Sequence, residues 1–125
     1  MILLAIAVGG GTGALLRHFV NHVVQARFGA EFPLGILIVN ILGCLTIGLF
    51  AGLIASTRIH VGEVGRAFVV VGILGGFTTF SSFGLDTFTL ARGGQIGAAL
   101  FNAFGQLALG LGAVWVGYAL AHVRV

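Results

Sequence analysis

A cluster of glycines, hydroxyls and phenylalanines interrupts an otherwise apolar run near the middle of this sequence. The segment reads Gly75-Gly76-Phe77-Thr78-Thr79-Phe80-Ser81-Ser82-Phe83. It packs two adjacent glycines, four hydroxyls and three phenylalanines into nine residues. In hydrocarbon, each unsatisfied backbone group costs several kcal/mol, so a helix is interrupted there only where protein or a polar cavity covers the freed groups. If the run spans a membrane, the segment predicts a broken helix and a site on the path of an ion or solute.

Composition places the run in a membrane. Hydrophobic residues make up 58% of the 125 residues and charged residues only 7%, whereas soluble domains carry about 25% charged residues. The excess of basic residues comes from six arginines against three acids, without a basic cluster, which argues against nucleic-acid binding. Cys44 is the only cysteine, so neither a disulfide framework nor a thiolate metal site is expected.

The length allows about four spans of ~20 residues in one domain that covers residues 1–125. Apolar patterning predicts an all-α membrane protein with spans at 2–24, 32–56, 64–90 and 95–122, the third of them broken near Gly75–Thr79. The N-terminal stretch lacks a basic n-region and is predicted to be the first span rather than a signal peptide.

Arginines are spread almost evenly over the two ends of this topology. One end holds Arg58, Arg66 and Arg124, and the other holds Arg27, Arg92 and, if it faces that way, Arg17. So weak a positive-inside bias is compatible with insertion in both orientations, and hence with an antiparallel homodimer, but equally with a unique, weakly set topology. Four glycine pairs spaced by four residues predict closely packed helices, at 9/13, 48/52, 72/76 and 93/97.

Polar and aromatic side chains form stripes on the third and fourth spans. Thr79, Ser82 and Asp86 share one helix face, and the face beside it holds Phe80, Phe83 and Thr87. Aromatic ring edges are electropositive, so inward-pointing phenylalanines can hold an anion edge-on; the alternative is ordinary packing.

Other polar residues complete the candidate path. Asn102 and Gln106 repeat every four residues and could face the first stripe. The amide of Asn40 offers two donors suited to a small anion, or simply bonds two helices together. Arg17 is interpreted as an anion-attracting residue at a vestibule or as a snorkelling side chain.

Other chemistries find little support in the sequence. The run Gly9–Gly13 lacks the lysine of a phosphate-binding loop. His18 and His22 are expected to form an interfacial pair rather than a metal site. Because no catalytic triad, nucleotide motif or membrane carboxylate pair is present, the chain is not expected to be an enzyme.

Three motifs resemble the small bacterial fluoride channels of the Fluc or CrcB family, and the similarity covers essentially the whole chain. They are Gly9 to Ala14 with Arg17, Gly35 to Asn40 with Gly43, and Gly75 to Phe83. The resemblance implies passive, fluoride-specific export that protects the cytoplasm, by an antiparallel, dual-topology homodimer in the bacterial inner membrane.

The same resemblance assigns roles to individual residues. Phe80 and Phe83 would be the pore phenylalanines, and Asn40 the pore asparagine. The polar side of the pathway would be formed by Thr79, Ser82, Asn102 and Gln106. The backbone carbonyls of Gly75 and Thr78, from both subunits, would hold a structural sodium ion that is not transported.

Some positions depart from the family pattern. Ile36 stands where a threonine is usual, Ser82 where a threonine is common, Gln106 where a small polar residue is frequent, and His18 where an aromatic residue is usual. None of these changes touches the phenylalanines or the asparagine, so they bear on conductance rather than on function.

Two other functions compete with this interpretation. A small dual-topology antiporter that exports a cationic compound would need a membrane carboxylate, but Asp86, the only acid in a span, lies near the end of its span. A non-transporting assembly subunit that packs through its glycines would leave the Phe80 motif unexplained.

Overall fold

The structure is a computed structural model that describes residues 1–123, and it contains helices but no strands over these residues. In chain order the elements are α1 (Ile2–Phe28), α2 (Leu34–Ala55), α3 (Glu63–Arg66), η1 (Ala67–Leu74), α4 (Gly75–Phe77), α5 (Phe80–Arg92), α6 (Ile96–Leu100), η2 (Phe101–Gly105) and α7 (Gln106–Leu120). The segments η1 and η2 are π-helical.

Four helical stretches are long and apolar enough to cross a membrane, at Ile2–Phe28, Leu34–Ala55, Glu63–Arg92 and Ile96–Leu120. These stretches confirm the four predicted spans, and their ends agree with the prediction to within about one helical turn. The chain is therefore a multi-pass, all-helical membrane protein.

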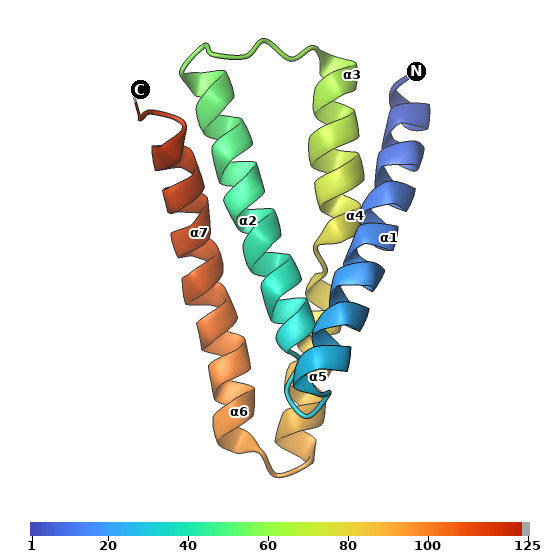
Figure 1. The fold of residues 1–125 in the computed structure, drawn as a ribbon, viewed down its shortest axis with the longest axis vertical. Coiled ribbons are helices and arrows are strands. Elements are labelled where there is room, and N and C mark those ends of the chain that lie inside the picture. Colours follow the sequence, from blue (N-terminus) through green and yellow to red (C-terminus); the bar gives the residue numbers. More distant parts are fainter. Residues whose placement is uncertain (124–125) are drawn as a thin grey trace.

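The spans form two arms that diverge toward one end of the molecule (Figure 1). One arm pairs α2 with α7, and the other pairs α1 with α3, η1 and α4. The N-terminus, the end of α7 and the α2–α3 connector lie at the open end, where Arg58 Nη2 donates to the Val123 carbonyl at 2.8 Å. The prediction that these segments share one side is thus confirmed as far as Val123, while Arg124 lies outside the described residues.

Glycines let the helices within each arm approach at backbone distance. A Cβ added at Gly9 would lie 2.6 Å from the Phe68 carbonyl oxygen and 3.0 Å from Gly72 Cα. In the other arm, a Cβ at Gly48 would collide with the Val114 carbonyl. Three of the four predicted pairs thus pack inside the chain, whereas a Cβ at Gly97 would meet open space.

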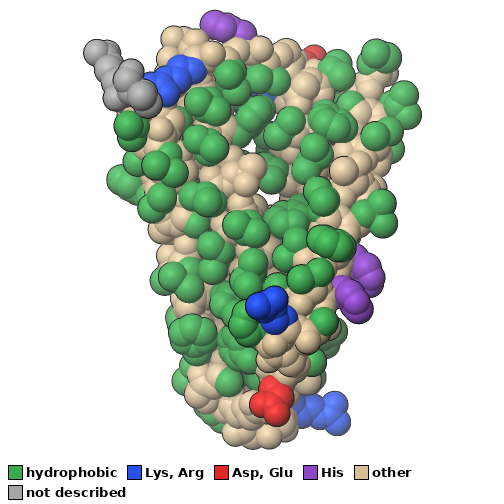
Figure 2. All heavy atoms as spheres, viewed as in Figure 1, with side chains coloured by type: hydrophobic (Ala, Val, Ile, Leu, Met, Phe, Trp, Pro, Cys, Tyr) green, Lys and Arg blue, Asp and Glu red, His purple; other side chains and the backbone are tan. Residues whose placement is uncertain are grey.

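The outer surface is apolar. Large hydrophobic side chains are exposed along the spans, among them Leu3, Leu15 and Trp115. Figure 2 shows hydrophobic side chains spread over most of the visible face, with only a few charged groups. Lipid tails or other apolar protein surfaces are the surroundings that such a surface requires.

The third span changes conformation after Phe77. Gly75, the first residue of the segment Gly75–Thr79, has helical dihedral angles (φ −64°, ψ −35°). The two residues that follow Phe77 are extended: Thr78 has φ −80° and ψ 156°, and Thr79 has φ −151° and ψ 119°. The helix resumes at Phe80, and Thr79 caps it by accepting the Ser82 N–H on its Oγ1 at 3.3 Å.

Candidate anion pathway

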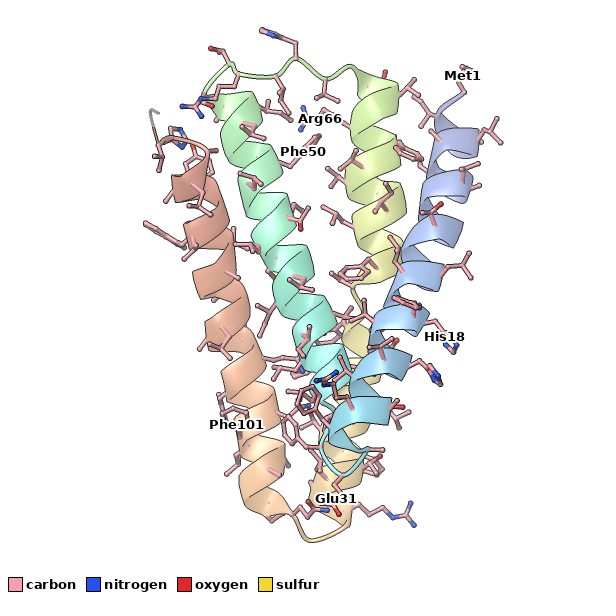
Figure 3. All side chains as sticks on the ribbon, viewed as in Figure 1. Met1, His18, Glu31, Phe50, Arg66 and Phe101 are labelled. Carbon is pink, nitrogen blue, oxygen red and sulfur yellow. The ribbon has the colours of Figure 1, made fainter. Side chains whose placement is uncertain are left out.

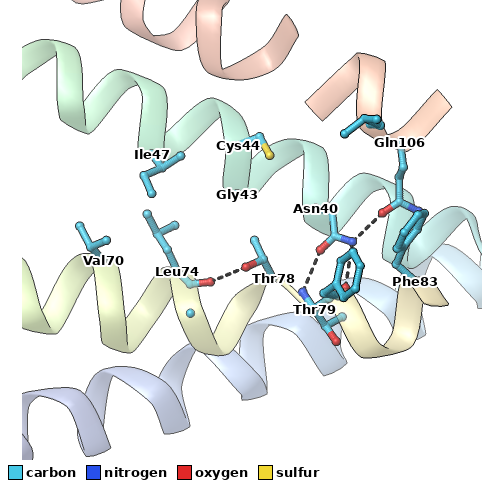
Figure 4. A pocket seen from close by; sticks show the side chains of 13 residues that line it. Asn40, Gly43, Cys44, Ile47, Val70, Leu74, Thr78, Thr79, Phe83 and Gln106 are labelled. Atoms are coloured by element: carbon cyan, nitrogen blue, oxygen red, sulfur yellow. Dashed lines mark hydrogen bonds between the residues drawn. The ribbon is translucent and has the colours of Figure 1, made fainter. Parts of the chain in front are cut away.

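The extended residues are held by one side chain from the second span. Asn40 Oδ1 accepts the Thr79 N–H at 2.9 Å, and Asn40 Nδ2 donates to the Thr79 carbonyl at 3.1 Å (Figure 4). In a continuous helix the Thr79 N–H would instead bond to the Gly75 carbonyl. Asn40 thus satisfies both backbone groups of Thr79, as hydrocarbon surroundings demand.

A chain of amide side chains continues from Asn40 toward the end at which the two arms meet. Asn40 Nδ2 also donates to Gln106 Oε1 at 2.6 Å, Gln106 Nε2 donates to Asn102 Oδ1 at 3.0 Å, and Asn102 Nδ2 donates to Thr87 Oγ1 at 2.8 Å. Asn102 is completely buried and Gln106 is 8% exposed. Four elements, α2, α7, η2 and α5, are therefore joined by one continuous line of polar side chains, which we call the amide chain (Asn40, Gln106, Asn102 and Thr87).

The partners of this chain differ in part from those expected. Asn102 and Gln106 were expected to face the stripe that contains Thr79, Ser82 and Asp86. Asn102 instead bonds Thr87, on the aromatic face of α5, and Gln106 reaches the third span only through Asn40. The cause is the direction of the side chains, since Thr87 turns its hydroxyl back to the Phe83 carbonyl at 2.8 Å and presents its lone pair to Asn102.

A cavity of about 420 Å³ lies beside the amide chain and between the arms. Figure 4 shows its walls, which come from α2, η1, α4, α5 and α7. Asn40, Thr79 and Gln106 supply its polar side, and Phe80 and Phe83 supply aromatic rings whose centroids lie 5.5 Å apart at 46°. The Phe80 side chain is 84% exposed in the single chain.

The lining of this cavity contains no arginine, histidine or carboxylate among the described residues. Its polar groups are neutral amides and hydroxyls, which can donate several hydrogen bonds to a small anion without fixing it by charge. The cavity therefore has the chemistry of a weak, multi-donor anion path rather than of a salt-bridged binding site.

The predicted hydroxyl stripe splits between two cavities. Thr79 Oγ1 donates to Ser82 Oγ at 3.2 Å, but Ser82 lines a second cavity of about 270 Å³ together with Asp86 and Ile36. Two buried oxygens in the lining of this second cavity, Asn21 Oδ1 and Asp86 Oδ2, have no hydrogen-bond partner among the described residues. Ser82 thus lies next to Thr79 without sharing the cavity that holds Phe80 and Phe83.

Arg17 lies close to one of the two carbonyls, those of Gly75 and Thr78, that are predicted to hold a sodium ion. Arg17 Nη1 donates to the Thr78 carbonyl at 3.4 Å, which is long for a hydrogen bond from a guanidinium group. The Gly75 carbonyl lacks the Thr79 N–H, its partner in a continuous helix, because that N–H is bonded to Asn40. The guanidinium group of Arg17 thus lies next to the extended residues of the third span.

The two histidines lie outside the site. His18 and His22 are exposed on α1, with ring centroids 6.4 Å apart, and Figure 3 shows His18 pointing away from the other helices. Over residues 1–123, no group of three or more His, Cys, Asp or Glu side chains is placed to hold a metal ion.

Two residues that the sequence did not assign to the pathway lie at the site. Thr87 ends the amide chain, and Cys44 lines the larger cavity next to Gly110. A signal for Thr87 was present, since it follows Phe83 by one helical turn. Cys44 carried no such signal, because it lies in an apolar stretch.

Four apolar spans around a donor-lined cavity are the architecture of a small membrane transport protein. Residues 4–118 match the model of a family described as "CrcB-like protein, Camphor Resistance (CrcB)", and the chain belongs to this family.

Curated relatives extend over nearly the whole chain. A protein of Opitutus terrae is 48% identical over 119 residues, which cover 94% of this chain and 90% of the relative. One from Thermus thermophilus is 47% identical over 122 residues, covering 98% and 96%, and one from Solibacter usitatus is 44% identical over 119 residues, covering 95% and 97%. Each of these relatives is named "Fluoride-specific ion channel FluC".

Proposed function

We propose that this protein is a fluoride-specific channel that passively exports fluoride from the cytoplasm and so reduces its toxicity. The observation that carries the proposal is the neutral, donor-rich amide chain beside the exposed aromatic pair Phe80 and Phe83. Family membership and the names of relatives that are 44–48% identical support the same ion. No covalent step is part of this function.

Selection for fluoride follows from how the path replaces water. Fluoride is small and strongly hydrated, so each donor that it leaves must be replaced by another nearby. In the larger cavity, Asn40 and Gln106 supply amide donors and Thr79 supplies a hydroxyl, while the electropositive edges of Phe80 and Phe83 supply weaker stabilisation. The proposed contribution of Ser82 is a hydroxyl from the neighbouring second cavity. Many weak sites in series allow the ion both to enter and to leave.

The complete channel is proposed to be an antiparallel homodimer, inserted in both orientations in the bacterial inner membrane. Two observations on the single chain support this arrangement. Phe80 is 84% exposed beside a cavity that opens between the diverging arms, which leaves room for a partner chain. The arginines are also nearly balanced between the two ends, as dual topology requires.

A structural sodium ion is proposed at the carbonyls of Gly75 and Thr78. The residues fit such an ion, because the Gly75 oxygen lacks its helical donor and the Thr78 oxygen receives only one long bond, so both retain lone pairs. One chain supplies two of these oxygens, so two chains would give about four ligands, suited to a hard cation. The positive charge of Arg17 opposes a cation at Thr78, so Arg17 is expected to turn away and act on anions in the vestibule.

Flux measurements on purified protein in liposomes test the function. With an ion-selective electrode, fluoride should leave the vesicles rapidly while chloride is retained. Equal rates for the two anions would refute fluoride specificity. Fluoride flux that requires a proton gradient would refute passive transport.

Two further experiments test the assembly and the ion. A cysteine placed at either terminus of a Cys44→Ala protein should react with an impermeant label from both sides of intact cells; labelling from one side only would contradict dual topology. Exhaustive removal of sodium should abolish fluoride flux. With sodium present, the protein should carry fluoride without carrying sodium. Full activity without sodium would contradict the structural ion.

A further inference from the structure

The direction of every hydrogen bond in the amide chain is fixed by backbone groups at its two ends. At one end the Thr79 N–H, which only donates, requires Asn40 to present Oδ1. At the other end the Phe83 carbonyl, which only accepts, takes the Thr87 hydroxyl proton and leaves Thr87 Oγ1 as an acceptor for Asn102 Nδ2. Asn102 Oδ1 must then accept from Gln106 Nε2, and Gln106 Oε1 from Asn40 Nδ2. Turning any one amide over would oppose two donors or two acceptors.

Counting hydrogens along this directed chain shows that Asn40 has no free donor. Its amide nitrogen carries two hydrogens, one bonded to the Thr79 carbonyl at 3.1 Å and the other to Gln106 Oε1 at 2.6 Å. An anion can only accept hydrogen bonds. It can therefore bind Asn40 only by replacing one of these two oxygens.

Of the two oxygens, that of Gln106 is free to leave. The Thr79 oxygen belongs to the backbone, next to the N–H that Asn40 also holds. The Gln106 oxygen lies at the end of a flexible side chain that borders the 420 Å³ cavity, together with Phe80 and Phe83. Gln106 Nε2 carries two hydrogens, and its bond to Asn102 Oδ1 uses only one of them. The second hydrogen is therefore available as a donor to an anion when the oxygen withdraws.

We propose that Gln106 is a displaceable internal ligand, whose Oε1 occupies the anion position on Asn40 and exchanges with fluoride during conduction. The inference rests on the proposed channel function and adds a residue that sets the apparent affinity for the ion. The concentration of fluoride that half-saturates flux then includes the free energy of breaking the bond between Asn40 and Gln106.

Two substitutions at this position separate competition from support of the fold. Gln106→Met and Gln106→Glu both remove the donor to Asn102, so a structural role would change flux in the same direction in both. The two variants differ in the group that they present to Asn40, because Met removes the strong acceptor whereas Glu keeps an acceptor and adds negative charge. In Gln106→Met, losing the competing bond should lower the half-saturating fluoride concentration about fivefold, since a hydrogen bond contributes a net ~1 kcal/mol. The Glu variant should raise it about tenfold or more.

The experiment measures initial fluoride efflux from liposomes against fluoride concentration, which separates half-saturation from maximal flux. Gln106→Ser is a second variant that withdraws the acceptor. If either Gln106→Ser or Gln106→Met fails to elute like the parent, the other is enough to test the loss of the competing bond. Leu111→Met, on an exposed side of α7, is the matched control and should keep the parent's half-saturation.

The outcomes distinguish the inference from the function on which it rests. A parent protein that conducts no fluoride overturns the proposed function. If the parent conducts fluoride, either of two results overturns the role of Gln106 alone. In the first, Gln106→Met and Gln106→Glu shift the half-saturating concentration in the same direction. In the second, Gln106→Met and Gln106→Ser leave it unchanged.

Discussion

The polar and the aromatic sides of the cavity are exposed in opposite ways. On the polar side, Asn102 is fully buried and Gln106 is 8% exposed, each with defined hydrogen-bond partners. On the aromatic side, Phe80 is 84% exposed, and its ring centroid lies 5.5 Å from that of Phe83. In water the opposite would be expected, because apolar groups are buried and amides remain solvated. In a bilayer the amides are costly unless paired, while an exposed phenylalanine costs nothing, so the two sides constrain the fold very differently.

This contrast predicts that substitutions on the polar side damage both folding and flux, whereas those on the aromatic side damage flux alone. The polar groups are interlocked, and each one removed leaves a buried partner unsatisfied. Phe80 is exposed and Phe83 is half-buried in the single chain, so replacing either ring should leave the fold of the chain intact.

The largest effect is expected from Asn40→Leu. The change leaves the Thr79 N–H and carbonyl and Gln106 Oε1 without their partner, and it removes the proposed anion donor. We expect fluoride efflux to fall about 100-fold and thermal stability in detergent to drop, since each unsatisfied group costs ~1–3 kcal/mol. Leu42→Ile, on the exposed side of the same helix, should behave like the parent. Parental efflux in Asn40→Leu would remove the polar side from the pathway.

A smaller effect, on flux alone, is expected from Phe80→Ile and from Phe83→Ile. Each keeps an apolar side chain but removes the electropositive ring edge, and an apolar swap of similar volume usually costs less than ~1.5 kcal/mol. Efflux should fall about tenfold, since losing ~1.4 kcal/mol of stabilisation corresponds to that factor, while the protein elutes as the parent does. Phe88→Ile, on the same helix and 60% exposed, serves as the control. If both pore variants conduct like the parent, the two rings are packing residues.

The smallest effect on flux is expected from Thr87→Val, at the far end of the amide chain. Valine keeps the shape but takes away the acceptor for Asn102 Nδ2, so the melting temperature should fall, with a loss of ~1 kcal/mol. Efflux should change by no more than about twofold, since one hydrogen-bond partner at the end of the chain is lost. Thr46→Val provides the comparison, because its exposed hydroxyl bonds only to Leu42 of its own helix. Equal stability of the two variants would contradict a cooperative chain.

Much of the fold could be predicted because it depends on local properties of the sequence. The span at Leu34–Ala55 follows from a continuous apolar stretch, and the packing at Gly9 and Gly72 follows from small residues spaced by four. Asn40 could be singled out because a lone amide in an apolar helix needs a partner. The partner itself could not be predicted, because Thr79 lies 39 residues away.

The sequence by itself therefore determined the class of the protein and its four spans. Each depends on composition and short-range periodicity, which the bilayer converts directly into structure. The tertiary structure alone decided that the extended residues are Thr78 and Thr79, that Thr87 completes the amide chain, and that Ser82 faces a second cavity. Those outcomes depend on which donors and acceptors from distant helices meet in space. Each buried polar group must find its partner there, and no local pattern records which partner it finds.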